Sequence, residues 1–464
     1  MNQASDAPCN IVLLTLDAFR KDFLGCYGSS LGATPNIDSL AGESVVFDNA
    51  YSFLFGTDPV HTSILTGLWP WSHGIIHHGP WVSKYEKRFV SLKDDQFLPR
   101  ILKESGYVTS AIDFLGRWYK TGFDYYSGSL RKNRMQSMLD FGHRAICKIF
   151  PRLPYWFLKH LPGTIAAYDY AEKVVEHAKG IIDKRPFFLF LHFWDTHTPY
   201  DPPPQYVRRF KHVKSKYNKK IKEIIDRISG PKYKRYMKMC TYSARSTDEI
   251  VQRYIGSLNY IDEQIGSLIS YFKANNLFDN TMIIVTFDHG EGLGEHNAYF
   301  GHHTHFEEIL KAALIIKFPK GAYKGSRVRP FARHIDVVPT ILDFLNIKTN
   351  HIFDGESLLT LINEPTRVKP RPVLFGFMHE RIGVGKRIGI IDNEWKYSFS
   401  LGPRRICPRC GFVHHQREEL FNLKDDPQEL VNLANEKKDL TKTLRQEIEK
   451  LINIQDGEIK KVLK

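Results

Sequence analysis

Short apolar runs that end in acidic residues recur along the chain. Asn10–Leu16 ends at Asp17, and Met282–Phe287 ends at Asp288. A third run, Phe187–Phe193, leads into the tetrapeptide Trp-Asp-Thr-His. Each run has the length of a buried strand and falls far short of the ~20 residues of a membrane-spanning helix. The pattern therefore predicts buried strands that deliver polar side chains at their carboxyl ends.

Helical periodicity alternates with these strands. Two further strands are predicted at Val108–Phe114 and Leu314–Phe318. Helices are predicted over Pro99–Ser105, Ala166–Ile182, Asp248–Asn275 and Ile335–Leu345, with helical spacing also over His61–Leu68. This alternation is typical of an α/β fold with a mainly parallel central sheet flanked by helices. In such sheets ligands bind beyond the carboxyl ends of the strands.

The pattern changes after about residue 346. Strand-like pieces occur at Arg371–Phe377, Arg387–Ile391 and Trp395–Phe399, followed by an amphipathic helix over Lys437–Ile454. We therefore predict a catalytic domain over residues 1–365 and a small C-terminal α+β subdomain over residues 366–464.

The composition is that of a globular protein. The 464 residues are 42% hydrophobic and 25% charged, which excludes a disordered or collagen-like chain. Residues 1–10 lack the basic and apolar regions of a signal peptide. Six cysteines are few for a secreted scaffold, so a cytoplasmic location is expected.

The net charge of +14 is concentrated in inserted segments. Residues 203–245 are densely basic with interleaved Tyr and Phe, and residues 128–164 combine Arg and Lys with Trp and Phe. Basic helical inserts favour anionic partners. For 203–245 a solvated helical lobe is the preferred interpretation, and an anionic partner is the alternative. For 128–164 a lid over the active site is preferred, and contact with an anionic membrane surface is the alternative. Nucleic acid is the disfavoured partner, and the sequence leaves the oligomeric state open.

Acidic and histidine residues at the predicted strand ends have metal-ligand chemistry. Asp17, Asp288 and His289 are suitable ligands for a divalent cation. Thr57 follows Gly56 at the start of a helical segment, where the helix N-terminus favours anions. A metal would activate this hydroxyl as a nucleophile. The alternative is that Thr57 only caps the helix.

Eight ordered segments resemble those of one enzyme family. They are residues 10–28, 55–75, 115–124, 190–200, 285–296, 300–319, 333–347 and 419–434, and the most specific is 285–296, VTFDHGEGLGEH. On these motifs the chain resembles the sulfatase branch of the alkaline phosphatase superfamily over nearly its whole length. The resemblance implies the corresponding α/β fold and an ester hydrolase.

The resemblance assigns roles residue by residue. It places Asp17, Asp288 and His289 as metal ligands and Thr57 as the nucleophile. It implies that His197, His302 and Arg117 are catalytic. It places His61, Tyr119, Asp195 and His303 among the substrate-binding residues.

The nucleophile motif departs from that of sulfatases. It reads Thr57-Asp58-Pro59-Val60-His61, whereas sulfatases carry a Cys or Ser that is oxidised to formylglycine. Threonine oxidation gives a ketone, so the aldehyde mechanism is excluded. Branches that keep threonine resemble phosphodiesterases and phosphoglycerol transferases. We therefore expect hydrolysis of a phosphodiester or phosphonate ester, lipid- or glycan-linked, or transfer of the phosphoryl group.

Two other functions stay open. The first is a sulfuric ester hydrolase that works without formylglycine. The second is a non-catalytic binder of nucleic acid or of an anionic membrane on a sulfatase scaffold. Against the second stands the complete set of Asp17, Thr57, Asp288 and His289.

The ligand set predicts one divalent metal. Ala18 replaces the second Asp of the family's common Asp-Asp pair. The remaining mixture of carboxylates, imidazole and hydroxyl favours Mn or Zn, with Ca or Mg as alternatives. A second metal held by Asp195, His197, His302 and His303 is the less favoured interpretation.

A Cys/His hairpin near the C-terminus has the spacing of a zinc site. Cys407 and Cys410 are separated by two residues, and His414 and His415 follow closely. Such a group can supply three or four ligands to a structural Zn. The alternative is a surface hairpin with two reduced cysteines, since no second C-x2-C pair exists in the sequence.

Overall fold

The computed structural model describes residues 8–127, 170–182, 185–364, 371–376, 386–403 and 406–455. The predicted insert at 128–164 lies outside the described residues. Within the described part of the chain, no helix combines the length and the apolar character that crossing a bilayer requires.

The central sheet has nine strands in the order β10-β2-β9-β6-β1-β5-β3-β4, with β11 also paired to β2. The strands are β1 (Asn10–Leu16), β2 (Val45–Tyr51), β3 (Val108–Ile112), β4 (Tyr125–Ser127), β5 (Phe187–Phe193), β6 (Thr281–Phe287), β9 (Lys311–Lys317), β10 (Arg327–Val328) and β11 (Ala332–Arg333). All pairings are parallel except those of β9, which runs antiparallel to β2 and β6. The predicted mainly parallel α/β fold is confirmed.

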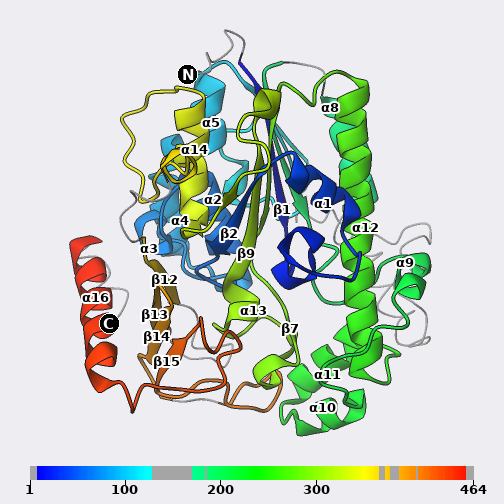
Figure 1. Ribbon diagram of the computed structural model, residues 1–464, viewed down its shortest axis with the longest axis vertical. Helices are drawn as coiled ribbons and strands as arrows, with labels where there is room; N and C mark the ends of the chain where they lie inside the picture. The colour runs from blue at the N-terminus through cyan, green and yellow to red at the C-terminus, as the bar shows by residue number, and fades with distance from the viewer. Residues whose placement is uncertain are drawn as a thin grey trace.

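Helices cover both faces of this sheet (Figure 1). One face carries α1 (Pro35–Gly42), α8 (Ala171–Ile181) and α12 (Thr247–Ala274), and the other carries α2 (Thr57–Thr66), α5 (Leu98–Glu104) and α14 (Val337–Phe344). Alternate residues of β1 point to opposite faces, so Ile11 and Leu13 enter one hydrophobic core and Val12 and Leu14 enter the other. This two-sided burial explains why the central strands are apolar without interruption.

The register of the central strands aligns their carboxyl ends. Leu16 of β1 lies opposite Phe193 of β5 and Phe287 of β6. Beyond that point the Asp17 N–H donates to the Phe193 carbonyl (2.9 Å), and the Asp288 N–H donates to the Leu16 carbonyl (3.3 Å). The residues that follow these three strands therefore meet at one edge of the sheet.

Strand β2 was not predicted. Its sequence, VVFDNAY, is interrupted by Asp48 and Asn49. The pairing of β2 with β9 shifts register between Phe47 and Ala50, at the same place. A bulge interrupts the alternation of apolar and polar residues on which strand prediction depends. The sequence of β2 therefore resembles that of a loop.

The remaining elements are short or belong to the C-terminal region. They are α3 (Pro70–His73), α4 (Lys84–Ser91), α9 (Pro204–Arg209), α10 (Ile221–Arg227), α11 (Pro231–Cys240), β7 (Gly292–Leu293), β8 (Tyr299–Gly301), α13 (Glu307–Leu310), α15 (Leu359–Asn363), β12 (Val373–Gly376), β13 (Arg387–Asp392), β14 (Trp395–Ser400), β15 (Glu418–Asn422) and α16 (Lys438–Gln455). Strands β12–β15 form an antiparallel sheet in sequence order. This sheet and α16 confirm the predicted small C-terminal α+β region.

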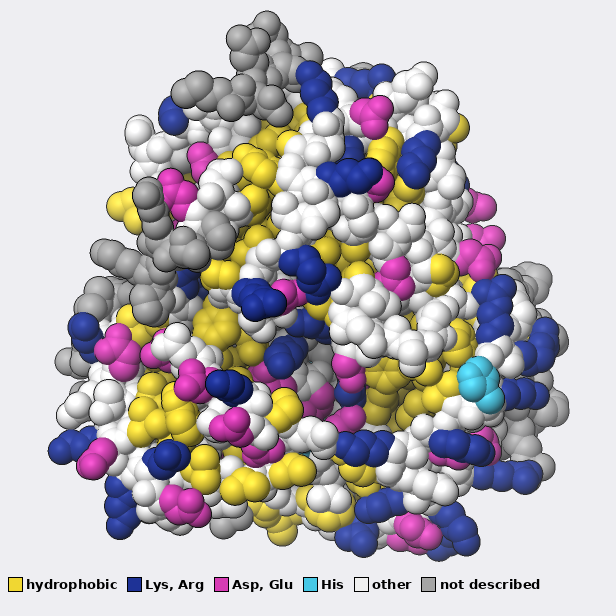
Figure 2. Space-filling model, in the orientation of Figure 1, with side chains coloured by type: hydrophobic (Ala, Val, Ile, Leu, Met, Phe, Trp, Pro, Cys, Tyr) yellow, Lys and Arg dark blue, Asp and Glu magenta, His cyan; other side chains and the backbone are white. Residues whose placement is uncertain are grey.

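The basic segment 203–245 contains the three short helices α9, α10 and α11. Figure 2 shows Lys and Arg side chains gathered over these helices, at the lower right of the face drawn. Most of these cations project to solvent, while Tyr206, Ile221, Ile224 and Met237 anchor the helices on the α12 side of the sheet.

A buried lysine joins the C-terminal sheet to the main domain. Lys396 of β14 contacts Glu307 of α13 (3.0 Å) and Glu429 (2.8 Å), and all three side chains are buried. Lys396 therefore neutralises two carboxylates that would otherwise repel each other in a medium of low polarity.

We expect Lys396→Met to lower the free energy of unfolding by about 3–5 kcal/mol, because it leaves the buried Glu429 without its cation, although Glu307 keeps Lys311 (3.1 Å). Urea denaturation of both proteins measures the change. Lys438→Met, at an exposed position of α16, is the control and should stay within about 0.5 kcal/mol of the wild type. Equal stability of the two variants would contradict this assignment.

Candidate active site

Three buried ligand atoms converge at the carboxyl edge of β1 and β6. Asp17, Asp288 and His289 each place one ligand atom within 4.8 Å of the others. The Asp17 Oδ1, Asp288 Oδ2 and His289 Nε2 atoms are buried and lack hydrogen-bond partners. Most buried polar atoms in proteins are hydrogen-bonded, so three free ligand atoms that face one another are suited to a cation. Two carboxylate oxygens and one imidazole nitrogen are ligand atoms that divalent cations bind. The residues therefore fit a divalent metal.

The backbone around these ligands is tightly constrained. Ala18 has a positive φ of 51°, and its N–H donates to the other Asp288 oxygen, Oδ1 (3.0 Å). The His289 N–H donates to the same oxygen (2.7 Å). At Gly290 an added Cβ would lie 1.9 Å from the Glu308 carbonyl oxygen. Only glycine fits there, and this close packing fixes the loop that carries His289.

Thr57 lies beside the ligand cluster. It is the first residue of α2, and Gly56 takes the N-cap position. Its Oγ1 donates to Asp17 Oδ2 (3.2 Å) rather than capping the helix. The hydroxyl therefore combines the positive end of a helix with a contact to a metal-ligand candidate, as a nucleophile requires. The alternative of a simple N-cap is wrong.

The surroundings shift the pKa values of the two carboxylates of the cluster in opposite directions. Burial, together with the negative charge of Asp17, raises the pKa of Asp288 to about 6. Burial alone would also raise the pKa of Asp17, but His192 and other nearby histidines outweigh it and lower this pKa. A cation that enters the cluster must displace the proton of Asp288.

Sequence reasoning missed the residues that hold Asp17. His192 of β5 places Nδ1 2.8 Å from Asp113 Oδ1 and Nε2 3.5 Å from Asp17 Oδ2. Burial lowers the pKa of His192, but Asp113 and Asp17 raise it to about 9. The sequence feature that could have identified His192 is its position as the only polar residue in the apolar run 187–193. The parallel register of β3 with β5 pairs Ile112 with Leu191 and so brings Asp113 beside it.

Asp58 accepts hydrogen bonds from several residues next to Thr57. It is buried at the second position of α2 and accepts hydrogen bonds from the Gly79 N–H (2.6 Å), Arg117 and Tyr119. The two predicted substrate contacts, Arg117 and Tyr119, thus engage Asp58 in this structure. Their contact with substrate stays a prediction, and their observed effect is to hold the start of α2.

Histidines from three segments line up beside the metal-ligand candidates. The His302 ring lies 4.1 Å from the His289 ring, 5.1 Å from that of His303 and 5.3 Å from that of His197. His197 is stacked on Trp194 at 3.9 Å. Burial lowers the pKa of His197 to about 4 and lowers the pKa values of His302 and His303 well below the usual value for histidine. These rings are therefore neutral near pH 7.

Two other predicted site residues lie differently. His61 is fully buried in α2, with its ring edge-on to His192 at 4.4 Å. The Asp195 carboxylate accepts from the Ala171 N–H at the start of α8 (3.2 Å). Among the described residues, the three-ligand clusters include neither Asp195 nor His197, His302 or His303. The structure therefore does not gather the proposed second-metal ligands. Substrate contacts of His61, Asp195 and His303 stay predictions.

The C-terminal hairpin brings together three of its four predicted ligands. Cys407, Cys410 and His414 form one cluster. His415 points elsewhere, because its Nδ1 contacts Glu419 (2.9 Å) and its Nε2 accepts from the His305 N–H (3.2 Å). Placing His415 in the zinc site was wrong, since two neighbouring residues of an extended chain point to opposite sides.

The fold, with its candidate metal ligands, is that of an ester hydrolase. Residues 9–347 match the sulfatase family, and residues 294–454 match the C-terminal region of N-sulphoglucosamine sulphohydrolase. The chain belongs to the sulfatase family of the alkaline phosphatase superfamily, as the sequence motifs predicted.

The matching proteins include a sulfatase and a phosphonate monoester hydrolase. The chain is 25% identical to an arylsulfatase of Clostridium perfringens, covering 92% of this chain and 90% of that one. It is 24% identical to the multifunctional alkaline phosphatase superfamily protein PehA of Trinickia caryophylli, covering 76% and 77%. The crystal structure of a phosphonate monoester hydrolase of Agrobacterium radiobacter matches with a TM-score of 0.67 at 20% identity, over 96% of this chain and 95% of that one.

We expect the affinity for Mn²⁺ to rise with pH through about 6, because the carboxyl of Asp288 has a pKa of about 6 and must lose its proton. Binding at pH 5 should be about tenfold weaker than at pH 7.5. Calorimetric titration at both pH values measures this, and equal affinities would contradict the role of Asp288 as a ligand.

We expect Asp113→Asn to weaken Mn²⁺ binding by about 10–100-fold, because it loosens His192 and through it Asp17. Glu43→Gln, at an exposed ion pair with Lys324, is a matched carboxylate control that should bind the metal normally. An unchanged dissociation constant for Asp113→Asn would show that His192 does not position Asp17.

Proposed function

We propose that this chain is a metal-dependent hydrolase that cleaves a phosphodiester or phosphonate ester, with Thr57 as the nucleophile. The observation that carries the proposal is the position of Thr57: it begins α2 and donates from Oγ1 to Asp17 Oδ2 at 3.2 Å. A threonine cannot become formylglycine, so the hydroxyl itself must attack. Transfer of the phosphoryl group to another alcohol uses the same first step.

The cation chemistry follows from the ligand cluster. A divalent ion held by Asp17, Asp288 and His289, Mn or Zn by preference, supplies a Lewis acid that favours the alkoxide of Thr57 and offsets the charge of the ester. Asp17 Oδ2 accepts the hydrogen bond of Thr57 Oγ1 and so orients the hydroxyl, whose proton passes to solvent. The N-terminus of α2 favours the anionic group that Thr57 attacks.

In the first step Thr57 Oγ1 bonds to phosphorus and the bond from phosphorus to the leaving oxygen breaks. The leaving alkoxide takes a proton from solvent, and the remaining phosphate monoester or phosphonate group stays bound to Thr57 Oγ1 as a covalent ester. In the second step water attacks phosphorus and gives up a proton, the bond to Thr57 breaks, and Thr57 Oγ1 takes up a proton that restores its hydroxyl. His197 suits the role of base here: its Nδ1 donates to the Thr198 carbonyl (2.8 Å), which leaves Nε2 unprotonated in the neutral ring.

A sulfuric ester hydrolase is the second candidate. The relatives include an arylsulfatase at 25% identity and an N-acetylglucosamine-6-O-sulfatase at 22% identity. Attack of Thr57 on sulfur would cleave a sulfate ester without a formylglycine residue. Such relatives, together with the basic helices α9–α11, also favour a glycan-linked anionic ester as the natural substrate.

The test is hydrolysis of four p-nitrophenyl esters: the phosphodiester, a phosphonate monoester, the phosphate monoester and the sulfate. Each is assayed with Mn²⁺, Zn²⁺, Mg²⁺ or Ca²⁺. We expect metal-dependent turnover of the diester or phosphonate. Thr57→Val, which keeps the shape but removes the hydroxyl, should lower kcat by about a thousandfold or more.

Thr57→Ser is the matched control, since it restores a hydroxyl at the same position and should retain far more activity than Thr57→Val. Sulfate as the preferred ester would favour the second candidate. Turnover that survives in Thr57→Val would exclude this residue as the nucleophile under either candidate.

A further inference from the structure

The turn at residues 407–412 is compact and anchored. The Cys407 N–H donates to the Phe412 carbonyl (2.7 Å), and the Gly411 N–H donates to the Cys407 carbonyl (2.8 Å). Gly411 has a φ of 78°, and a Cβ there would lie 2.6 Å from the Arg227 carbonyl oxygen of α10. Glycine therefore allows the turn to lie directly against α10. Both cysteine side chains are buried in it.

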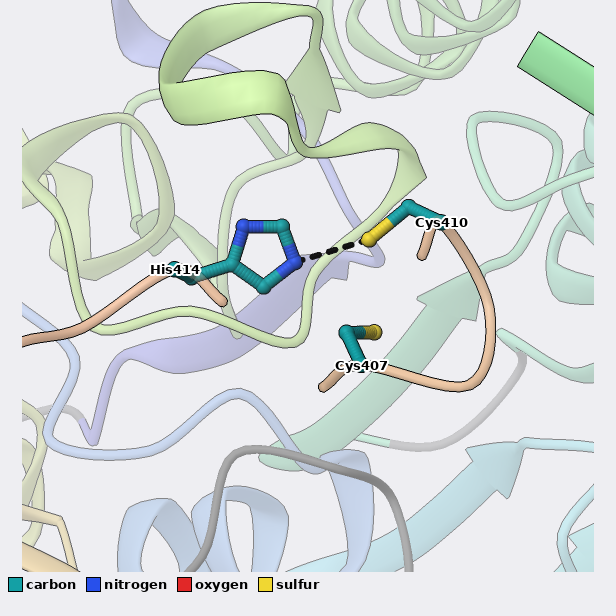
Figure 3. Close-up of side chains that lie close together, drawn as sticks. All are labelled: Cys407, Cys410 and His414. Atoms are coloured by element: carbon teal, nitrogen blue, oxygen red, sulfur yellow. Dashed lines mark hydrogen bonds between the residues drawn. The ribbon is translucent and has the colours of Figure 1, made fainter. Parts of the chain in front are cut away.

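Three soft ligand atoms face one another in this turn. The ligand atoms of Cys407, Cys410 and His414 lie within 4.8 Å of one another, and Cys410 Sγ is 2.8 Å from His414 Nε2. Figure 3 shows Cys410 and His414 pointing toward each other, with Cys407 beside them. Two thiols and one imidazole form a donor set typical of Zn²⁺, and water commonly completes a three-residue site.

The histidine of the cluster is held in the tautomer that binds a metal. His414 Nδ1 donates to the backbone carbonyl of His296 (3.0 Å), so the Nε2 lone pair faces the sulfur atoms. Metal-binding histidines are oriented by this kind of hydrogen bond. The contact also fixes the hairpin to the loop between β7 and β8, which follows the catalytic Asp288 and His289 in the chain.

Arg409, the second of the two residues between the cysteines, lies near the histidines of the candidate active site. The Arg409 guanidinium is 4.8 Å above the ring of Tyr236, whose hydroxyl lies 3.3 Å from Thr198 Oγ1, next to His197. Burial is the main reason for the lowered pKa of His302 and His303, and the positive charge of Arg409 adds to it. Within the described residues, no carboxylate forms an ion pair with Arg409. A half-buried cation beside neutral histidines is suited to an anion.

We propose that Cys407, Cys410 and His414 bind a thiophilic divalent cation such as Zn²⁺, and that the closed hairpin holds Arg409 as an anion-binding residue of the catalytic pocket. The second half of this statement rests on the proposed function. This metal site is separate from the cluster at Asp17, and it positions Arg409 rather than taking part in the reaction.

Metal analysis of the purified full chain tests the site. The wild type should contain one equivalent of zinc more than Cys407→Ser, Cys410→Ser and His414→Gln. Cobalt replacement should give a sulfur-to-cobalt charge-transfer band that these variants lack. Cys26→Ser is the control and should retain both the full zinc content and the band. A zinc content in all three hairpin variants equal to that of the wild type, or an absence of zinc from the wild type, would overturn the proposal. So would a Cys407–Cys410 disulfide found by mass spectrometry.

Binding of inorganic phosphate tests Arg409 without requiring turnover. Arg409→Gln should weaken phosphate binding about tenfold while the zinc content stays unchanged, and Arg409→Lys should recover part of the loss. Cys407→Ser should also weaken phosphate binding, because the metal no longer fixes the turn that carries Arg409. Arg235→Gln, an exposed arginine of α11, is the control. Normal binding by Arg409→Gln would overturn the role of Arg409, whereas a failed ester panel with weakened phosphate binding would contradict only the proposed function.

Discussion

The pair of buried carboxylates at the ends of β1 and β6 constrains the rest of the site. Parallel pairing places Asp17 and Asp288 side by side, away from water, where two like charges are strongly unfavourable. A shared proton or a divalent cation relieves this. The surroundings favour the cation, because His192 already holds one oxygen of Asp17 while two backbone N–H groups hold one oxygen of Asp288. What remains is one free oxygen from each carboxylate beside His289.

The parts of the fold that follow from local pattern were predicted accurately from the sequence. Strands β1 and β5 have the predicted bounds, because uninterrupted apolar runs bounded by polar residues leave little choice. The metal-ligand candidates followed from the ends of β1 and β6 and from the family motifs. The bulged strand β2 and the antiparallel direction of β9 were not predicted, because they depend on partners distant in the chain.

Residues that act through other residues were the main omission at the site. Asp58, Asp113 and His192 have no spacing signal of their own, since each acts through contacts made across the sheet. Arg117 and Tyr119 were identified from a motif, but their contacts with Asp58 could be seen only in three dimensions. The exclusion of His415 from the hairpin cluster likewise depends on which way adjacent side chains point, and on Glu419 as a competing partner.

The hairpin between β14 and β15 has a consequence for how such a scaffold diversifies. The ligand cluster is carried by central strands whose side chains are packed on both faces, so almost any change there disturbs the core. The turn that carries Arg409 joins two strands of a separate small sheet and can change length or sequence without altering the register of the central strands. Changes in this turn can therefore alter which substrate is recognised and leave the reaction at the central strands unchanged.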